Sequence, residues 1–320
     1  MPETIILGEA LVDFVPTESG LPLAEVPGFY KRFGGAPANV AMGMSKLGSD
    51  VGFVGKVGQD SFGDFLKDRF VEAGVNVDQL YRTGRANTTL AFVSLTEEGD
   101  RDFAFYRNPG ADELLKPEEI REKAFKDARV FHFGSLSLTK KESKEATKKA
   151  IEVARKNGLK VTMDPNIRLN LWSNRSRLKR LVKSLLKKVD ILKLSKEEVS
   201  FLTGSDDLGV GTAELADLGP DPVIVTLGEE GCLFYYKGTL EKLDSYKVEA
   251  KDTTGAGDGF MAGFLHTLLK NTENLSELDS RELLPAVRFG NATGALTTTD
   301  YGATSAFPNS ELVESFLADR

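Results

Sequence analysis

A short glycine-rich segment, DTTGAGDG at residues 252–259, combines residue types that suit phosphate chemistry. The apolar residues after it recur with helical spacing, so Gly255, Ala256 and Gly257 are predicted to lie in or just before a helix's first turn. Backbone N–H groups there lack intrahelical partners, and the helix dipole favours an anion beside them. Asp258 is interpreted either as a base for an attacking hydroxyl or as an ordinary first-turn acid, with its pKa lowered by the dipole.

A second glycine-rich segment, FGGAPANVAMGMSKLG at residues 33–48, precedes another predicted helix. Gly34 and Gly35 open the backbone before that helix, and Pro37 suits its first turn. Asn39 falls within the first turns. The glycine N–H groups and the Asn39 amide could meet a sugar hydroxyl, and tight helix packing is the alternative interpretation.

Two strand ends offer further polar side chains. In GEALVDF, Asp13 is expected at the end of the first strand, where open parallel sheets bind ligands and a carboxylate can accept polyol hydroxyls. DPNIRLNLW, residues 164–172, follows another strand and offers Asn166 and Arg168, the latter for substrate, phosphate or a surface ion pair. The chain has no GxxxxGK[ST] motif and no GxGxxG after a strand, so neither a P-loop nor a Rossmann cofactor site is predicted.

The elements that must position these residues alternate along the chain. Short runs rich in Val, Ile and Phe lie between helical patterns, which predicts an α/β fold with a mainly parallel sheet covered on both faces. Helices are expected at residues 36–47, 61–74, 141–157, 174–188, 256–270 and 281–298.

One region departs from this alternation. Two alternating runs within residues 88–110, joined by EEGD, predict a hairpin. Together with part of residues 14–33 it is expected to form a small β lid, or alternatively an edge extension without function. No linker or repeat divides the chain, so a single domain over residues 1–320 is expected.

Composition excludes several classes of protein. The net charge is −7, which disfavours a nucleic-acid partner, and the basic stretch at residues 175–190 keeps its leucines on one face, as a surface helix does. The single cysteine, Cys232, sits in an apolar run and is interpreted as core packing. No run of 18 apolar residues and no basic leader occur, so no membrane association is expected and the cytoplasm is the expected compartment.

Four motifs together resemble those of the ribokinase-like (PfkB) carbohydrate kinases. GGAPANVA, DPNIR, VTLGEEG and DTTGAGDGF occur in the family's order and span nearly the whole chain. The resemblance implies a three-layer α/β/α fold with a β lid. It also implies an ATP-dependent kinase that uses Mg²⁺ to phosphorylate a sugar hydroxyl.

The resemblance assigns roles around the two glycine-rich segments. Asp258 matches the family's catalytic base, and residues 255–257 match its anion hole. The implied sugar-binding positions are Asp13, Gly34, Gly35, Asn39, Arg168 and, in the lid, Tyr106 and Arg107.

Further positions are implied for the nucleotide and for cations. The nucleotide turn matches Thr226, Gly228 and Gly231, and Asn291 falls where the adenine is held. Glu198 is expected to help hold Mg²⁺ through water, although Ser195 replaces the asparagine of the family's NxxE segment, which suggests altered metal or phosphate dependence. A monovalent cation such as K⁺ would lie near Asp252, Thr254, Thr297, Asp300 and Gly302.

The lid segment favours one sugar within the family. FAFYRNPGAD, residues 103–112, is similar to the lid of fructokinases, which implies transfer to the 6-hydroxyl of D-fructose. 2-Keto-3-deoxygluconate kinase is the alternative, but its relatives usually carry Tyr-Tyr-Arg where this chain has Phe105-Tyr106-Arg107. Another sugar kinase of the family, or a non-catalytic binding protein, is the remaining interpretation. Family lids often pair, so a homodimer through the lid is expected.

Overall fold

The computed structural model describes residues 2–18, 20–95 and 101–320, and it contains a large sheet of nine strands. The strand order is β13-β12-β11-β10-β9-β8-β1-β4-β5, with parallel pairing from β11 to β5 and antiparallel pairing of β12 and β13 at one edge. Its strands are β1 (Thr4–Leu7), β4 (Val51–Gly58), β5 (Asn76–Thr83), β8 (Val130–Phe133), β9 (Lys160–Met163), β10 (Ile191–Ser195), β11 (Val223–Thr226), β12 (Cys232–Tyr236) and β13 (Thr239–Leu243). All eight residues of β4 are buried, as expected for a central strand covered on both faces.

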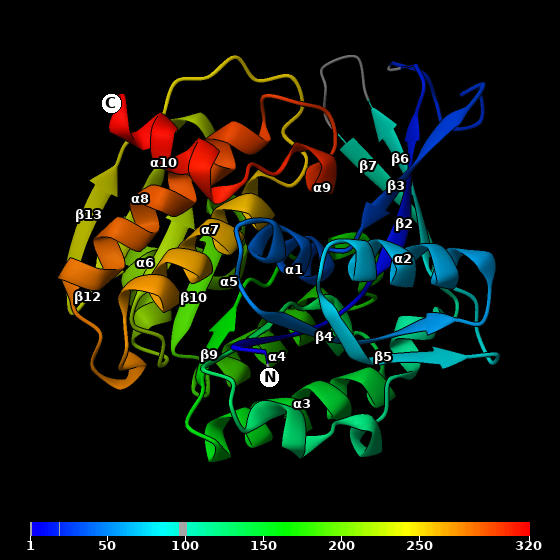
Figure 1. The fold of residues 1–320 in the computed structure, drawn as a ribbon, viewed down its shortest axis with the longest axis horizontal. Helices are drawn as coiled ribbons and strands as arrows, with labels where there is room; N and C mark the ends of the chain where they lie inside the picture. Colours follow the sequence, from blue (N-terminus) through cyan, green and yellow to red (C-terminus); the bar gives the residue numbers. More distant parts are fainter. Residues whose placement is uncertain (1, 19, 96–100) are drawn as a thin grey trace.

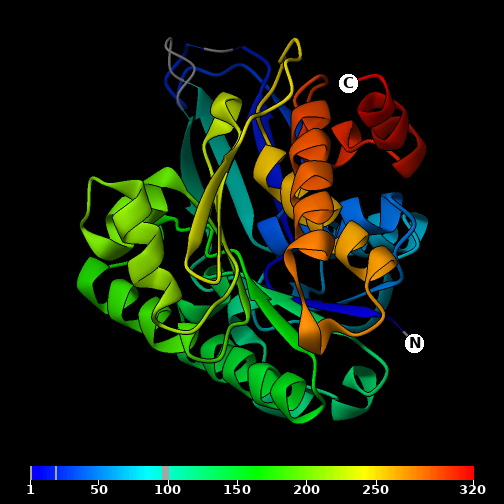
Figure 2. The ribbon, with the colours of Figure 1, turned by 90° about the vertical axis from the view of Figure 1, so that its left-hand side faces the viewer.

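Helices cover both faces of this sheet, so the predicted three-layer α/β/α arrangement is confirmed (Figure 2). One layer contains α1 (Ala36–Lys46), α2 (Ser61–Glu72), α7 (Ala256–Asn271), α8 (Ser280–Thr297), α9 (Ala303–Ala306) and α10 (Ser310–Ala318). The other contains α3 (Lys141–Lys156), α4 (Arg175–Leu186), α5 (Lys196–Thr203) and α6 (Leu208–Ala216). Short 3-10 helices lie at 111–114, 117–119, 122–125, 136–138, 169–171, 228–230 and 275–277.

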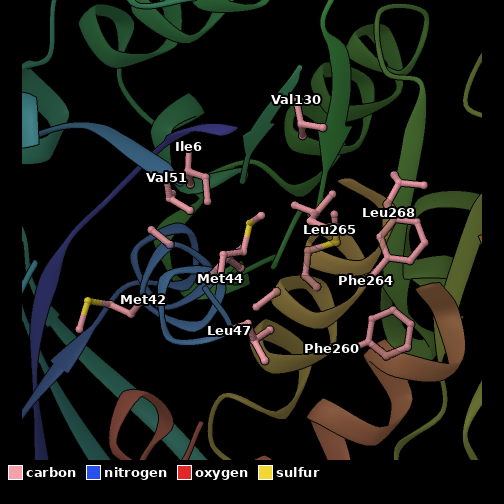
Figure 3. Packing of buried hydrophobic residues seen from close by; sticks show 14 of the residues in the cluster. Ile6, Met42, Met44, Leu47, Val51, Val130, Phe260, Phe264, Leu265 and Leu268 are labelled. Carbon is pink, nitrogen blue, oxygen red and sulfur yellow. The ribbon is translucent and has the colours of Figure 1, made fainter. Parts of the chain in front are cut away.

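The helix that follows the glycine-rich segment is locked in the core. Phe260, Phe264 and Leu268 of α7 are at most 3% exposed and lie in the core on the side of α7 that faces away from α1 (Figure 3). On the side facing α8, a side chain at Gly263 would come within 2.3 Å of Thr293 Oγ1. Helix α7 therefore packs closely against its neighbours, which fixes its N-terminal turn in place.

A second sheet of four strands forms the predicted lid and stands apart from the main sheet in Figure 1. Its order is β3 (Phe29–Gly34), β2 (Leu11–Pro16), β6 (Leu90–Leu95) and β7 (Arg101–Tyr106). Antiparallel pairing of β6 with β7 confirms the hairpin, whereas the EEGD turn lies outside the described residues.

The placement of Asp13 at the end of the first strand of the main sheet is wrong. Strand β1 ends at Leu7, and Asp13 lies within β2 of the second sheet, paired with Arg32 of β3. The continuous apolar pattern of residues 4–15 hid the break between the two strands. The lid therefore begins earlier than residue 14, and Asp13 reaches the site from the lid.

The described helices include none that is both long and apolar enough to cross a membrane. Helix α4 buries Leu178, Val182 and Leu186 against the sheet, which confirms the surface-helix interpretation of the basic stretch.

Candidate active site

The first turn of α7 has the geometry of an anion-binding site. Gly255 caps the helix in the left-handed conformation, with φ 78°, and a side chain there would meet Ala303 Cβ at 2.5 Å. The N–H of Ala256 donates to the Thr253 carbonyl at 3.3 Å. Within the described ranges, the N–H groups of Gly257 and Asp258 have no protein acceptor. Two donors at the positive end of α7 are thus available to an anion.

Asp258 is buried beside these donors and held in one orientation. It is 7% exposed, and its Oδ2 accepts a hydrogen bond from Asn39 Nδ2 at 2.8 Å. Burial raises the pKa of Asp258 to about 7; the Asn39 hydrogen bond opposes this, Asp164 adds to it, and Lys193 and Arg168 oppose it. The expectation that the helix dipole would lower this pKa is wrong, because loss of solvation outweighs the dipole.

Two cavities meet at Asp258. The lid-side cavity, about 500 Å³, is lined by residues of the lid, of α1 and of the segment between β1 and β2. They include Glu9, Asp13, Gly35, Asn39 and Phe105. The sheet-side cavity, about 390 Å³, is lined by residues of β10, of α5 and of the segment after β9, including Asp164, Lys193, Ser195 and Glu198. Both cavities also touch Asn166, Arg168, Gly255 and Asp258. The carboxylate and the helix N-terminus therefore lie where two ligands could meet.

The lid-side cavity depends on small residues before α1. A side chain at Gly34 would come within 2.1 Å of Asp13 Oδ2, so the glycine leaves room for that carboxylate. Gly35 has φ 102°, and a side chain there would meet the Glu9 carbonyl oxygen at 2.4 Å. Asp13, Gly34 and Gly35 are therefore brought together, and Asp13 and Gly35 line the cavity. The Asn39 amide, predicted to contact a hydroxyl, also binds Asp258.

The sheet-side cavity contains a buried ion pair. Lys193 Nζ donates to Asp164 Oδ2 at 2.7 Å, and the two side chains are 7% and 6% exposed. Burial works against the charge of Lys193, but the Asp164 carboxylate raises the pKa of this ammonium, so it stays charged. A side chain at Gly257 would lie 2.8 Å from Lys193 Nζ. The absent Cβ thus lets a fixed positive charge lie next to the first turn of α7.

Ser195 and Glu198 form a capping box at the start of α5. Glu198 N donates to Ser195 Oγ at 3.3 Å, and Ser195 N donates to Glu198 Oε2 at 2.8 Å. Glu198 Oε1 also accepts from Ile167 N at 2.7 Å. Burial and Asp164 raise the pKa of Glu198, while the two backbone donors oppose the shift. The serine at this position therefore has a structural task as the N-cap of α5.

The two lid residues expected to bind substrate are placed differently from one another. Tyr106 is 67% exposed, and its ring packs against Phe92. Arg107 is buried, and its guanidinium binds Asp112 at 2.5 Å and Glu113 at 3.3 Å. Neither Tyr106 nor Arg107 is among the residues that line the lid-side cavity.

The expected nucleotide positions continue from the sheet-side cavity. Ser195 pairs with Thr226 in the parallel register of β10 and β11, so the two strand ends lie side by side. Gly228 and Gly231 follow β11 with φ 63° and 96°, and Gly231 N donates to the Gly228 carbonyl at 3.2 Å. Asn291 of α8 is buried and donates to the buried Cys232 thiol of β12 at 3.5 Å.

The segments 252–254 and 297–302, expected to hold a monovalent cation, are joined by Asp252. Its Oδ2 accepts from Gly302 N at 2.8 Å, and its Oδ1 accepts from the Thr254 N–H and hydroxyl at 2.9 and 2.6 Å. Thr297 Oγ1 donates to the Thr293 carbonyl, and Asp300 Oδ1 accepts from Tyr301 N. Asp252 therefore holds the two expected cation-binding segments side by side.

Three buried charged residues at the site were not singled out from the sequence: Glu9, Asp164 and Lys193. Burial raises the pKa of Glu9 to about 7, although backbone hydrogen bonds and the Arg107 guanidinium oppose the shift. Asp164 directly follows the buried strand β9, and Lys193 lies within the buried strand β10. A charged residue at such a position was the available signal, because charges are rarely buried without a task.

Comparison with known proteins places this site in a family. Residues 1–310 match the model of the pfkB family carbohydrate kinases. The chain belongs to the PfkB family of carbohydrate kinases.

Relatives and solved structures within this family include several fructokinases. Probable fructokinase-4 of Arabidopsis thaliana is 43% identical over 314 residues, covering 98% of this chain and 96% of that protein. Fructokinase-2 of Solanum lycopersicum is 43% identical over 305 residues, with 95% and 92% covered. The structure of Xylella fastidiosa fructokinase with bound ATP has a TM-score of 0.89 at 35% identity, with 100% and 99% covered. That of Vibrio cholerae O395 fructokinase with fructose, ADP and a calcium ion has a TM-score of 0.90 at 33% identity, with 99% of each chain covered.

Proposed function

We propose that this protein transfers the γ-phosphate of ATP to the 6-hydroxyl of D-fructose. The observation that carries the proposal is the position of Asp258, whose carboxylate and neighbouring N–H donors lie where the lid-side and sheet-side cavities meet. A sugar in the first cavity and a nucleotide triphosphate in the second would bring hydroxyl and phosphorus together at this carboxylate. The fructokinase relatives, which cover nearly the whole chain, support the same reaction.

In the proposed mechanism, ionised Asp258 accepts the O6 proton as the oxygen attacks the γ-phosphorus. The O6–P bond forms, the bond from the γ-phosphorus to the bridging β-phosphate oxygen breaks, and ADP leaves. The Asn39 hydrogen bond keeps the carboxylate aimed, while the Gly257 and Asp258 N–H groups and the Lys193 ammonium stabilise charge on the phosphoryl oxygens. A pKa near 7 makes Asp258 a stronger base than an ordinary aspartate while leaving it largely ionised in mildly alkaline solution.

The oxygen ligands of the sheet-side cavity suit Mg²⁺ bound mainly through the nucleotide. The part of the chain that the structure describes contains no group of three or more His, Cys, Asp or Glu side chains able to hold a metal. Mg²⁺ commonly binds through one or two carboxylates, waters and substrate phosphates, and Asp164 and Glu198 line this cavity. When bound, the ion would neutralise phosphate charge. We propose K⁺ at the joined segments around Asp252 as a second cation.

The state of the lid arginine supports fructose over a sugar acid such as 2-keto-3-deoxygluconate. The guanidinium of Arg107 is bound to the carboxylates of Asp112 and Glu113, and the side chain is 2% exposed. A substrate carboxylate would have to compete with these two acids for the Arg107 guanidinium. The relatives named fructokinase support the same choice.

We further propose a single kinase domain closed by the four-stranded lid, located in the cytoplasm and paired as a homodimer through the lid. Tyr30 of β3 and Tyr106 of β7 are 55% and 67% exposed and belong to the two edge strands of that sheet. Exposed aromatic residues on unpaired strand edges favour association with a second copy.

A coupled ADP-release assay tests the proposal directly. The full-length protein with ATP and Mg²⁺ should turn over D-fructose with a higher kcat/KM than ribose, 2-keto-3-deoxygluconate, adenosine or fructose 6-phosphate. If one of these competitors has the highest kcat/KM, the fructose assignment is wrong. If no sugar or nucleoside is phosphorylated, the kinase proposal itself is wrong.

A further inference from the structure

A third cavity lies between α7, α8 and α10. Its volume is about 500 Å³, and it is lined by residues of these helices and by Tyr246 from the segment after β13. None of its lining residues lines the lid-side or sheet-side cavity. Asn291 of α8 points instead to Cys232 of β12, on the inner side of the helix layer. A volume of this size is ordinary for small-molecule sites.

The polar lining of this cavity carries an excess of positive charge. Lys270 is paired with Glu314 at 2.9 Å, so these two charges offset one another. Arg288 is exposed, and none of the described residues offers it an acidic partner within ion-pair distance. Arg320 also lines the cavity, with its guanidinium 3.9 Å above the Phe316 ring. The unneutralised guanidinium groups favour an anion, because guanidinium binds phosphate in a bidentate manner.

A buried imidazole forms part of the cavity wall. His266 lines the cavity and is 9% exposed, and its Nδ1 lies 2.8 Å from Ser49 Oγ. Its Nε2 is buried and has no hydrogen-bond partner within the described ranges. Burial and the Lys270 ammonium lower the pKa of His266, with Glu314 opposing, so the ring is neutral at pH 7. The ring therefore adds no charge to this wall, and the net charge of the lining comes from the arginines.

The remaining walls are apolar. Phe289 and Pro285 of α8, Leu317 of α10 and the Tyr246 ring line the same space. Phe289 packs against the His266 ring at a centroid distance of 5.8 Å. A ligand here would therefore need an apolar body as well as a charged group, which neither water nor a simple inorganic ion provides.

We propose that the cavity between α7, α8 and α10 is a binding site for a small phosphate monoester with an apolar or aromatic body. The phosphate would contact Arg288, and the body would pack on Phe289 and Leu317. The site is separate from the proposed kinase reaction, because it neither uses nor contacts Asp258.

Calorimetric titration of the full chain with phenyl phosphate tests this site. Saturating fructose and ADP are kept in the cell so that the proposed active site is filled. Phenyl phosphate should bind with one site per chain, and inorganic phosphate and benzyl alcohol should each bind at least about ten-fold more weakly, because each lacks one half of the recognition. Equal binding of inorganic phosphate would identify an adventitious ion only and overturn the proposal.

Matched arginine variants locate the binding. Arg288→Gln removes an exposed charge and should leave the fold intact. It should nevertheless lower the affinity for phenyl phosphate by at least about ten-fold. Arg175→Gln makes the same change at an exposed position of α4, on the other face of the sheet, and should have no effect. The proposal is overturned if phenyl phosphate does not bind at millimolar concentration, or if the two variants bind it equally well.

Discussion

Replacing Asp258 with Asn should nearly abolish turnover and, in alkaline solution, make the protein more stable. The amide oxygen of the new side chain can still accept the Asn39 hydrogen bond, so the geometry around it is preserved. It cannot accept the proton of a hydroxyl, and loss of a general base lowers kcat by about two to four orders of magnitude. The fructose KM should change far less, because the polyol contacts of the lid-side cavity remain.

The predicted gain in stability comes from the raised pKa of the wild-type carboxyl. Its value is 3.8 in an ordinary aspartate and about 7 in the folded protein. The proton is therefore held more tightly in the folded state, so the stabilising effect is fully present below about pH 4 and is lost as the pH rises through 7. The pKa difference of about three units corresponds to about 1.4 kcal/mol per unit, so the free energy of unfolding of the wild type falls by about 4 kcal/mol. The asparagine variant has no ionisable group at this position and shows no such fall. About two of these three units are lost between pH 5 and pH 8. The difference in free energy of unfolding between the wild type and Asp258→Asn should therefore change by roughly 3 kcal/mol over this interval.

Urea unfolding without ligands at pH 5 and pH 8 measures this difference. Asp68→Asn, at an exposed position of α2, makes the same chemical change and should show no such divergence. In the wild type, kcat/KM for fructose should also fall about ten-fold per pH unit well below pH 7, because only the ionised carboxylate accepts the proton. The reasoning is refuted if the gap in unfolding free energy between wild type and Asp258→Asn is the same at both pH values, or if the variant turns over normally.

Substitutions at three other positions test the anion site, the buried lid ion pair and the α5 cap. Gly257→Ala places a methyl group against Lys193 Nζ and narrows the anion site. The kcat should therefore fall at least about ten-fold, while the fructose KM stays within about two-fold of the wild type. A kcat equal to that of the wild type would contradict the role of this turn. Arg107→Met leaves two buried carboxylates without their partner and should cost about 3–5 kcal/mol in urea unfolding, whereas a cost below about 1 kcal/mol would show that the pair is not needed for the fold. Ser195→Ala should lower the free energy of unfolding by about 1 kcal/mol through loss of the α5 N-cap. Ser195→Asn retains a capping oxygen and should keep the stability of the wild type. Equal stability of the two variants would argue against capping.

Local chemistry made much of the fold predictable from sequence. The six expected helices all form, with ends within two residues of those expected, because apolar spacing and N-cap residues such as Asp60 and Asn174 mark them. Strand β4 coincides with one of the short Val- and Phe-rich runs, and all of its residues are buried. Strands β5 and β13 were not predicted, because several of their residues are exposed at the sheet's two edges and carry no apolar pattern.

The site was predictable in its parts but not in its connections. Glycines before two helices indicated where backbone donors would be open, since that signal is local. The hydrogen bond from Asn39 to Asp258 joins residues 219 positions apart, and no local pattern carries it. The pKa of Asp258 was misjudged for the same reason, because it depends on how deeply α1 and the strand ends bury the carboxylate.

The position of the transferred phosphate tests the central claim most directly. The protein is incubated with ATP, Mg²⁺ and D-fructose, and the product is identified by ³¹P and ¹³C NMR. The account predicts fructose 6-phosphate and ADP in equal amounts, with formation of both suppressed in the Asp258→Asn variant. Phosphate on the 1-hydroxyl, or ATP hydrolysis without any sugar phosphate, would contradict the proposed arrangement of hydroxyl, carboxylate and anion site.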